Sequence, residues 1–99
     1  MNKKELALYE RAGYSCELCD GISGLQKHHI VKRSQGGKDS LDNLILLCWQ
    51  CHHGKKGVHG RDGHALDLCL KLRLQEKLFS KGMSESQVRE YMGGKIYDS

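Results

Sequence analysis

Four cysteines stand in two pairs whose spacing is typical of a metal-binding site. The pairs have the pattern Cys-x-x-Cys, are separated by residues 20–47, and consist of Cys16, Cys19, Cys48 and Cys51. Each such turn presents two thiolates, so two turns that meet provide the four sulfur ligands of a tetrahedral zinc ion. Four protein ligands leave no coordination position for water or substrate. The spacing therefore predicts a structural zinc ion and not a catalytic one.

Two other interpretations of these cysteines explain the sequence less well. A redox Cys-x-x-Cys is expected near a β-α-β pattern, and none is visible in the sequence. Four unrelated core cysteines would rarely fall into two correctly spaced pairs. The fifth cysteine, Cys69, has no partner in its leucine-rich segment, and we interpret it as a small buried residue.

Three histidines and an asparagine between and beside the cysteine pairs carry groups that hydrolytic chemistry requires. They are His28, His29, Asn43 and His52. Hydrolysis needs a water nucleophile, a base that deprotonates it, and positive charge near the transition state. Because neighbouring residues of a strand point to opposite faces, we expect His28 and His29 to have different roles. Each histidine taken alone is more often a half-buried polar residue, and Asn43 alone is typical of a turn.

Short secondary-structure elements have to position these groups. Residues 3–12 are rich in helix formers and Gly13 follows them, which predicts a helix that ends there. Residues 25–31 and 44–47 have the composition of two short strands, joined by a long, turn-rich connection into a hairpin. A helix is expected directly afterwards, over residues 48–56.

The last third of the chain has a mixed pattern. Its leucines alternate with other residues, as in a strand: Leu66, Leu68, Leu70, Leu72 and Leu74. Strong helix formers surround them and no β-branched residue occurs among them, which favours a helix over residues 62–80. Residues 84–87, Ser-Glu-Ser-Gln, have the form of a capping box and predict a final helix that reaches about Met92.

Taken together, the order of these motifs resembles the HNH endonuclease family. The motifs are His-His-Ile at 28–30, Asn-Leu at 43–44 and Cys-x-x-Cys-His-x-x-Lys at 48–55. The resemblance covers residues 13–56. It implies an α+β fold, in which a small ββα-metal (His-Me finger) core with a four-cysteine zinc site is flanked by an N-terminal helix and C-terminal helices. We accordingly interpret residues 1–99 as a single HNH nuclease domain with a helical extension at about 62–92.

The resemblance implies a role for each motif residue. His28 and His52 become ligands of a catalytic divalent ion, and His29 becomes the general base that activates water. An imidazole has an ordinary pKa of about 6.5, so His29 is available as a base at neutral pH. Asn43 joins His29 in the catalytic set because it braces the loop that holds the base. Mg²⁺ or Mn²⁺ is the expected ion, while two imidazoles also accept Ni²⁺, Co²⁺ or Zn²⁺.

The chain departs from the family pattern at three positions. The family often has Asp or Glu where His28 stands, Pro where Lys32 stands and Thr where Lys56 stands. None of these departures removes a catalytic group, but they bear on the preferred ion and on the contacts with DNA.

Three further histidines lie after or outside the motif. His53 is an alternative ligand to His52, although a position that faces a ring or DNA fits it better. His59 and His64 belong to the glycine-rich segment 57–64. We expect that segment to be mobile and its histidines to be exposed to solvent.

The charge balance permits a nucleic-acid partner. Lys and Arg number 16 against 12 Asp and Glu, which gives a formal net charge of +4. The basic residues expected near the site, and therefore expected to bind DNA phosphates, are Lys27, Lys32, Arg33, Lys38, Lys55 and Lys56. Phosphate contacts of this kind give salt-dependent affinity with little sequence preference. The alternative is an ordinary solvated face.

Composition excludes several classes of protein. With 99 residues, of which 38% are hydrophobic and 6% aromatic, the chain has a thin core that a metal ion would help to hold together. It has no apolar stretch long enough to span a bilayer and no apolar signal-peptide core. We therefore expect a reducing compartment, the bacterial cytoplasm or the host cytoplasm of a bacteriophage, in which cysteines bind metal.

The resulting hypothesis is a metal-dependent DNA endonuclease or nickase. One site cuts one strand at a time, as a monomer or within a homodimer. Small members of the family occur in bacteriophages, some beside DNA-packaging genes, so a packaging protein such as a terminase is an expected partner. A non-catalytic zinc module that binds nucleic acid would need neither His29 nor His52. A thiol-based or zinc-storage protein would leave the histidine spacing unexplained.

Overall fold

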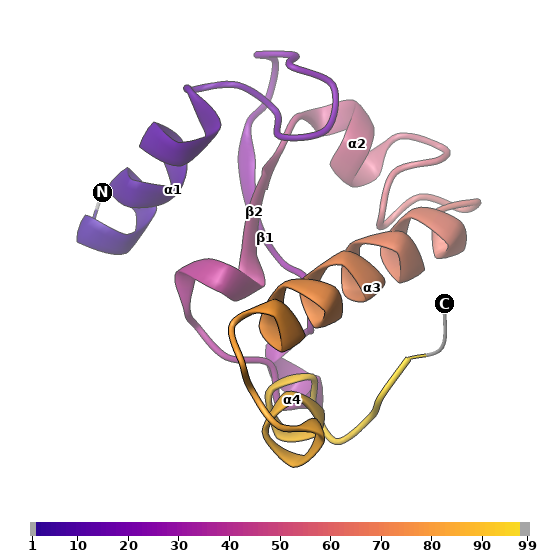
Figure 1. The fold of residues 1–99 in the computed structure, drawn as a ribbon. Helices are drawn as coiled ribbons and strands as arrows, with labels where there is room; N and C mark the ends of the chain where they lie inside the picture. Colours follow the sequence, from indigo (N-terminus) through magenta and orange to yellow (C-terminus); the bar gives the residue numbers. More distant parts are fainter. Residues whose placement is uncertain (1, 98–99) are drawn as a thin grey trace.

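The computed structural model describes residues 2–97 and confirms an α+β fold built around a two-stranded sheet (Figure 1). In chain order the elements are α1 (Lys3–Ala12), β1 (Gln26–His29), β2 (Leu44–Leu47), α2 (Trp49–His53), α3 (His64–Ser80) and α4 (Glu85–Tyr91), with 3-10 turns at Arg33–Gln35 and Leu41–Asn43. Within the described range, none of the helices combines the length and the apolar character that crossing a membrane requires.

The two strands form the predicted antiparallel hairpin, with α2 directly after it. Gln26 lies opposite Leu47 and His29 opposite Leu44. The long connection between the strands contains both 3-10 turns. The hairpin and α2 together make a ββα unit, in which the second half of β1 carries His28 and His29.

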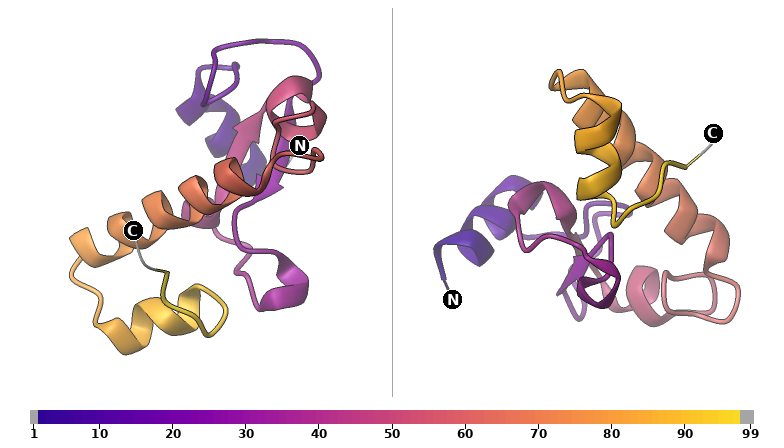
Figure 2. Two further views of the ribbon diagram at one scale, coloured as in Figure 1. Left: turned by 90° about the vertical axis from the view of Figure 1, so that its right-hand side faces the viewer. Right: turned by 90° about the horizontal axis from the view of Figure 1, so that it is seen from below.

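Strand β2 is apolar throughout because both of its faces are covered. Leu44 and Leu46 pack in one cluster with Leu8 of α1, whereas Ile45 and Leu47 belong to the larger cluster formed with α3 and α4. Figures 1 and 2 place α1 and α3 on opposite sides of the hairpin accordingly. Full burial of each leucine stabilises the fold by roughly 1.5–3 kcal/mol relative to exposure.

Helix α1 ties the N-terminal segment to the hairpin. Its N-cap Asn2 accepts a hydrogen bond from Glu5 N at 2.8 Å, and Gly13 ends it in a left-handed conformation with φ 68°. Near its end, Arg11 donates to both carboxylate oxygens of Glu17 and to the Leu44 carbonyl, the last at 2.7 Å. This fork fixes the first cysteine turn relative to β2.

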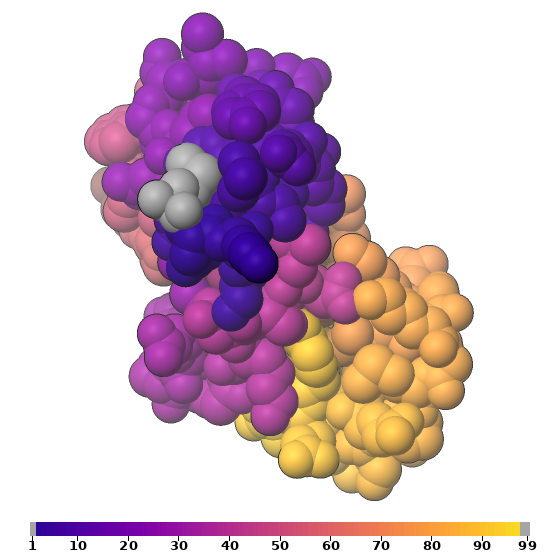
Figure 3. Space-filling view, turned by 90° about the vertical axis from the view of Figure 1, so that its left-hand side faces the viewer, coloured from indigo at the N-terminus to yellow at the C-terminus, as the bar shows by residue number. Residues whose placement is uncertain are grey.

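The C-terminal third is helical, as the residue types predict. In α3 the buried positions are Leu70, Leu74 and Leu78, which have the four-residue spacing of a helix face. The capping box of α4 is confirmed: Gln87 N donates to the Ser84 hydroxyl, and the Gln87 side chain accepts from Ser84 N. Figure 3 shows α1 over the upper part of one face, with the C-terminal helices on the lower part.

Three local predictions need correction. Helix α2 is shorter than residues 48–56, because the backbone becomes extended at Gly54 (φ −62°, ψ 168°). A Cβ there would lie 2.4 Å from the Gln50 carbonyl oxygen, so this exit from the helix requires glycine. The segment expected to be mobile is instead hydrogen-bonded to α2; Val58 N, for example, donates to the Cys51 carbonyl at 2.9 Å. Cys69 is exposed rather than buried, since it lies beside the inward-facing Leu70.

Candidate metal centres and catalytic cleft

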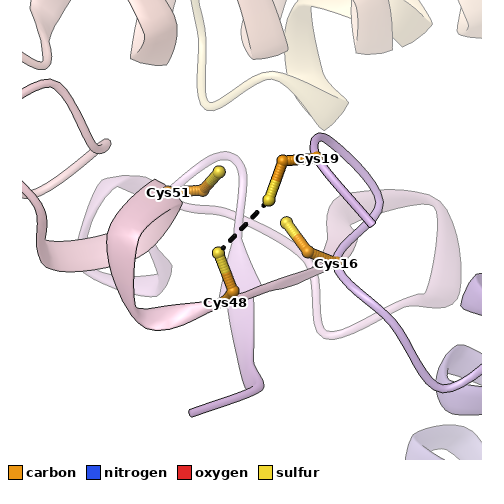
Figure 4. A group of neighbouring side chains, drawn as sticks. All are labelled: Cys16, Cys19, Cys48 and Cys51. Carbon is orange, nitrogen blue, oxygen red and sulfur yellow. Dashed lines mark hydrogen bonds between the residues drawn. The ribbon is translucent and has the colours of Figure 1, made fainter. Parts of the chain in front are cut away.

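The four paired cysteines converge in space. Their sulfur atoms all lie within 4.8 Å of one another, and the Sγ atoms of Cys19 and Cys48 are 3.5 Å apart. Figure 4 shows the side chains pointing toward a common centre, two from the turn after α1 and two from the start of α2. A tetrahedral ion with Zn–S bonds of about 2.3 Å holds its sulfurs about 3.8 Å apart. The cluster therefore fits a zinc ion.

Backbone hydrogen bonds shape the first cysteine turn. Cys16 N donates to the Gly21 carbonyl at 2.8 Å, and Asp20 N donates to the Cys16 carbonyl at 2.9 Å. The turn also extends the pairing of β2, because Glu17 N donates to the Leu46 carbonyl and Leu46 N donates to the Glu17 carboxylate. The first pair of sulfurs is thus held against the strand that leads into the second pair.

The thiols of this cluster do not ionise equally without a cation. Burial by itself raises the pKa of Cys16, but backbone hydrogen bonds from Cys48, Leu18 and Cys19 outweigh it and lower the value to about 7. Burial and the neighbouring cysteines raise the pKa of Cys51 well above its usual range. Four adjacent thiolates therefore require a positive ion at their centre, which the predicted zinc supplies.

A second convergence brings together three imidazoles. The ligand nitrogens of His28, His52 and His59 lie within 4.8 Å of one another. The ring centroids are 5.2 Å apart for His28 and His52, 5.1 Å for His28 and His59, and 4.7 Å for His52 and His59. The Nε2 atom of His28 is buried and has no hydrogen-bond partner among residues 2–97. An unpartnered buried nitrogen beside two other rings fits a metal ligand.

The environment keeps two of these rings neutral. Burial, followed by the nearby rings of His52 and His59, lowers the pKa of His28 to about 4. Burial, followed by His53 and His59, lowers the pKa of His52 to about 4. Neutral rings present the lone pairs that a divalent ion requires.

Gln26 at the start of β1 orients the His52 ring. Its side-chain oxygen accepts a hydrogen bond from His52 Nδ1 at 2.6 Å and another from His53 Nε2 at 3.0 Å. Because Nδ1 of His52 carries the proton, Nε2 keeps its lone pair. The ring of His53 lies 4.2 Å from that of His52, but His53 does not belong to the three-histidine group.

His29 lies on the other face of β1, as the strand period predicts. Its Nε2 is 3.1 Å from the Asp39 carboxylate, which also pairs with Lys4 of α1. Hydrogen bonds from His29 and Lys4 lower the pKa of Asp39. Since the carboxylate accepts and does not donate, the proton of this bond belongs to Nε2, and in the neutral ring the lone pair is then on Nδ1.

A single open cleft connects the two histidine faces. The side chains that line it are Lys27, His28, His29, Lys32, Arg33, Ser34, His52 and His59. Three of the six basic residues expected near the site therefore do line it. Lys38 borders a separate hollow against α4, Lys55 pairs with Asp62 at 3.8 Å, and Lys56 is exposed outside the cleft.

Asn43 is fully buried and joins the two ends of the connection between the strands. Its side-chain oxygen accepts from Val31 N at 2.9 Å, and its amide nitrogen donates to the carbonyls of Val31 at 3.0 Å and Lys38 at 2.7 Å. The last bond lies one residue before Asp39, the partner of His29. Asn43 thus spans the loop between the end of β1 and the start of β2.

Sequence reasoning did not find three residues of this site. His59 comes from a loop whose path the motif spacing does not encode, and its recurring glycines are equally typical of a mobile segment. Asp39 reaches His29 across a long connection, for which no local pattern exists. Gln26 precedes the motif as an ordinary polar strand residue. Only the fold brings these three to the histidines.

Comparison with known proteins identifies the segment that carries most of this site. Residues 16–57 match the HNH endonuclease model. This segment, which is somewhat under half of the chain, is similar to HNH endonucleases. It includes the four paired cysteines, His28, His29, Asn43 and His52, whereas His59 lies beyond its end.

Two curated relatives share parts of the HNH segment. "Probable mobile endonuclease C" of Enterobacteria phage T4 is 48% identical over 31 residues, which cover 31% of this chain and 15% of that protein. "Type IV methyl-directed restriction enzyme EcoKMcrA" of Escherichia coli K12 is 46% identical over 35 residues, which cover 35% of this chain and 13% of that protein. The chain thus spans only a small part of the length of either relative. No solved structure matches it.

Proposed function

We propose that the chain is a metal-dependent DNA endonuclease that hydrolyses phosphodiester bonds and nicks one strand at a time. The observation that supports this most is the buried His28 ring, whose Nε2 has no partner among residues 2–97 and which lies beside the rings of His52 and His59 in a cleft that His29 also lines. A non-catalytic zinc module would have no use for such a nitrogen. The family of the HNH segment supports the same class of reaction.

Two metal sites follow from the donor sets. The four sulfurs hold a structural Zn²⁺ with no open position. His28 and His52 hold the catalytic divalent ion, for which the family resemblance favours Mg²⁺ or Mn²⁺. When bound, a divalent ion polarises the phosphate and offsets the negative charge that develops in hydrolysis.

The proton transfer belongs to His29. Asp39 fixes the ring through Nε2, so Nδ1 accepts a proton from the attacking water. The water oxygen bonds to phosphorus as the bond to the leaving sugar oxygen breaks. Asn43 acts through the backbone: it holds residues 31 and 38 in place, and with them the loop that carries Asp39. Asn43 and Asp39 are therefore positioning residues.

Basic side chains hold the DNA. Lys27, Lys32 and Arg33 line the cleft and contact the phosphates on either side of the cut bond. The other three basic residues make weaker, outer contacts: Lys38, Lys55 and Lys56. Phosphate contacts alone give little sequence preference, so DNA is recognised by charge and shape.

Residues 1–99 work as one domain in this proposal, because the hairpin shares its core with α3 and α4. A single cleft suits a monomer that nicks, or a homodimer that cuts both strands. A cytoplasmic enzyme of bacteriophage origin, acting beside a packaging protein such as terminase, fits the kind of small nuclease that the chain resembles.

Relaxation of supercoiled plasmid tests the proposal. Wild-type protein with Mg²⁺ or Mn²⁺ should convert the plasmid to the nicked circle, and EDTA should prevent it. His29→Ala should slow nicking by about 10²–10⁴-fold, the range for loss of a general base, with unchanged circular dichroism. His64→Ala, a histidine outside the cleft, is the matched control. Plasmid binding without nicking by the wild type would instead favour a binding module.

A further inference from the structure

The third imidazole of the histidine cluster comes from outside the HNH segment. His59 lies two residues beyond residue 57, where the family match ends. Its ring nevertheless stands as close to His28 and His52 as they stand to each other. The residue that completes the cluster is thus supplied by the loop between α2 and α3, and not by the motif.

The loop that carries His59 is built for close backbone contact. Every third residue is a glycine, at Gly54, Gly57, Gly60 and Gly63. A Cβ at Gly60 would lie 1.8 Å from the Gly54 carbonyl oxygen, and one at Gly63 would lie 1.8 Å from the Gly57 carbonyl oxygen. Only glycine permits this winding. Each of the last three glycine amides also donates to the carbonyl of the glycine three residues earlier.

The same loop is fixed to α2 at the point where the two metal sites meet. Val58 N donates to the Cys51 carbonyl at 2.9 Å, and His59 N donates to the His52 carbonyl at 2.8 Å. Cys51 belongs to the sulfur cluster and His52 to the histidine cluster. The backbone of His59 is therefore hydrogen-bonded to His52, and the rings of these two residues lie 4.7 Å apart.

An incidental surface histidine does not account for this arrangement. Its neighbour His28 is 5% exposed and has an Nε2 atom without a partner in the described part of the chain. The ring of His53 lies 4.2 Å from that of His52, but its Nε2 donates to Gln26 and it is not among the three histidines whose ligand nitrogens converge. Among residues 2–97, His59 is the histidine whose ligand nitrogen lies within 4.8 Å of those of both His28 and His52.

We propose that His59 is a third protein ligand of the catalytic ion, so that the site has three imidazole nitrogens and selects a transition metal over Mg²⁺. The inference rests on the proposed function of the cleft and deepens it: a third imidazole changes the preferred ion there from Mg²⁺ to a transition metal. Imidazole suits Ni²⁺, Co²⁺ and Zn²⁺, whereas Mg²⁺ prefers oxygen ligands and retains its water. Three ligands still leave positions open for water and phosphate.

Calorimetric titration of zinc-loaded protein with Ni²⁺ tests the ligand directly and needs no DNA. The wild type should bind one Ni²⁺ in addition to its zinc and should bind Mg²⁺ far more weakly. His59→Gln should weaken Ni²⁺ binding by at least about tenfold. His53→Gln, the matched control, should leave it unchanged. Equal Ni²⁺ affinity for His59→Gln and wild type, or Mg²⁺ binding as tight as Ni²⁺ binding, would overturn the inference.

A spectroscopic measurement on the wild type does not depend on the folding of a variant. A second equivalent of Zn²⁺, added after the cysteines are filled, should shift a ring ¹⁵N resonance of His59 together with those of His28 and His52. An unshifted His59 resonance would exclude it as a ligand. If His59 binds metal but the protein does not nick plasmid, the proposed function fails alone. If the protein nicks plasmid with Mg²⁺ and His59 binds nothing, this inference fails alone.

Discussion

The cysteine cluster and the histidine cluster differ in ligand number and in what surrounds them. The first has four thiols from two turns that close around a centre, which leaves no room for a reacting molecule. The second has three rings at the wall of an open, basic cleft. Both depend on α2, because Cys48 and Cys51 stand at its start and His52 follows at once. The cysteine cluster takes two ligands from the start of α2, and the histidine cluster takes His52 from the same helix.

The largest expected effect separates the two clusters by stability. Cys48→Ser should abolish cooperative thermal unfolding, because structural zinc contributes about 10–16 kcal/mol in small zinc domains. Cys69→Ser should leave the unfolding transition in place, since Cys69 is exposed and belongs to neither cluster. Circular dichroism during heating measures both. A normally folded Cys48→Ser protein would show that the sulfur cluster does not hold the fold together.

Asn43 connects the fold to the cleft, so its loss should affect both. Asn43→Ala leaves the buried polar groups of Val31 and Lys38 without partners and should lower the free energy of unfolding by about 3 kcal/mol. Asn2→Ala, which removes an exposed helix cap, should cost about 1 kcal/mol. Urea unfolding gives both values. Similar values for the two variants would argue against a bracing role.

Much of this arrangement is predictable from the sequence, and the reason is locality. The cysteine pairs, the capping box at Ser84 and the strand at residues 44–47 are each encoded within a few neighbouring residues. The prediction of α3 as a helix requires the residue types as well as the spacing of its leucines, because their alternation by itself indicates a strand.

The missed features depend on contacts between distant parts of the chain. The pairing of His29 with Asp39 joins the end of β1 to a residue ten positions later in the connection between the strands. The approach of His59 depends on how the loop winds back onto α2. Neither contact corresponds to a recognisable spacing of residues in the sequence. The glycines at every third position are visible there, but they do not distinguish a mobile loop from a tightly wound one, because free turns and tight backbone contacts both select glycine.

A smaller effect should distinguish positioning from chemistry within the cleft. Asp39→Asn keeps the size of the side chain but replaces the charged partner of His29, so plasmid nicking should fall by roughly tenfold, less than for His29→Ala. Asp62→Asn, a carboxylate outside the cleft, should nick at the wild-type rate. If Asp39→Asn lost as much activity as His29→Ala, Asp39 would have a direct chemical role.

The charge around the histidine cluster predicts a graded effect on DNA binding. Arg33→Ala should reduce the slope of log affinity against log salt by about 1, because Arg33 lines the cleft. Lys38→Ala should change the slope less, since Lys38 borders a different hollow. Fluorescence anisotropy of a labelled duplex at several salt concentrations measures both. A larger change of slope for Lys38→Ala than for Arg33→Ala would indicate that the DNA lies nearer to α4 than proposed.

The smallest expected effect is the change of Ni²⁺ affinity with pH. The lowered pKa values of His28 and His52, both about 4, keep these rings unprotonated in the folded protein. Protons should therefore compete with Ni²⁺ only as the pH falls toward 4, and affinity should change little between about pH 7.5 and 5.5. Rings with an ordinary pKa of about 6.5 would lose about tenfold each per pH unit below it. Calorimetry across this range decides between them.

Anomalous X-ray scattering from crystals of zinc-loaded protein soaked in Ni²⁺ tests the contrast between the clusters most directly. Data at the two absorption edges should place zinc among the sulfurs of Cys16, Cys19, Cys48 and Cys51, and nickel among His28, His52 and His59. Nickel found only among the sulfurs, or bound away from all three histidines, would contradict the assignment of one closed structural site and one open reactive site.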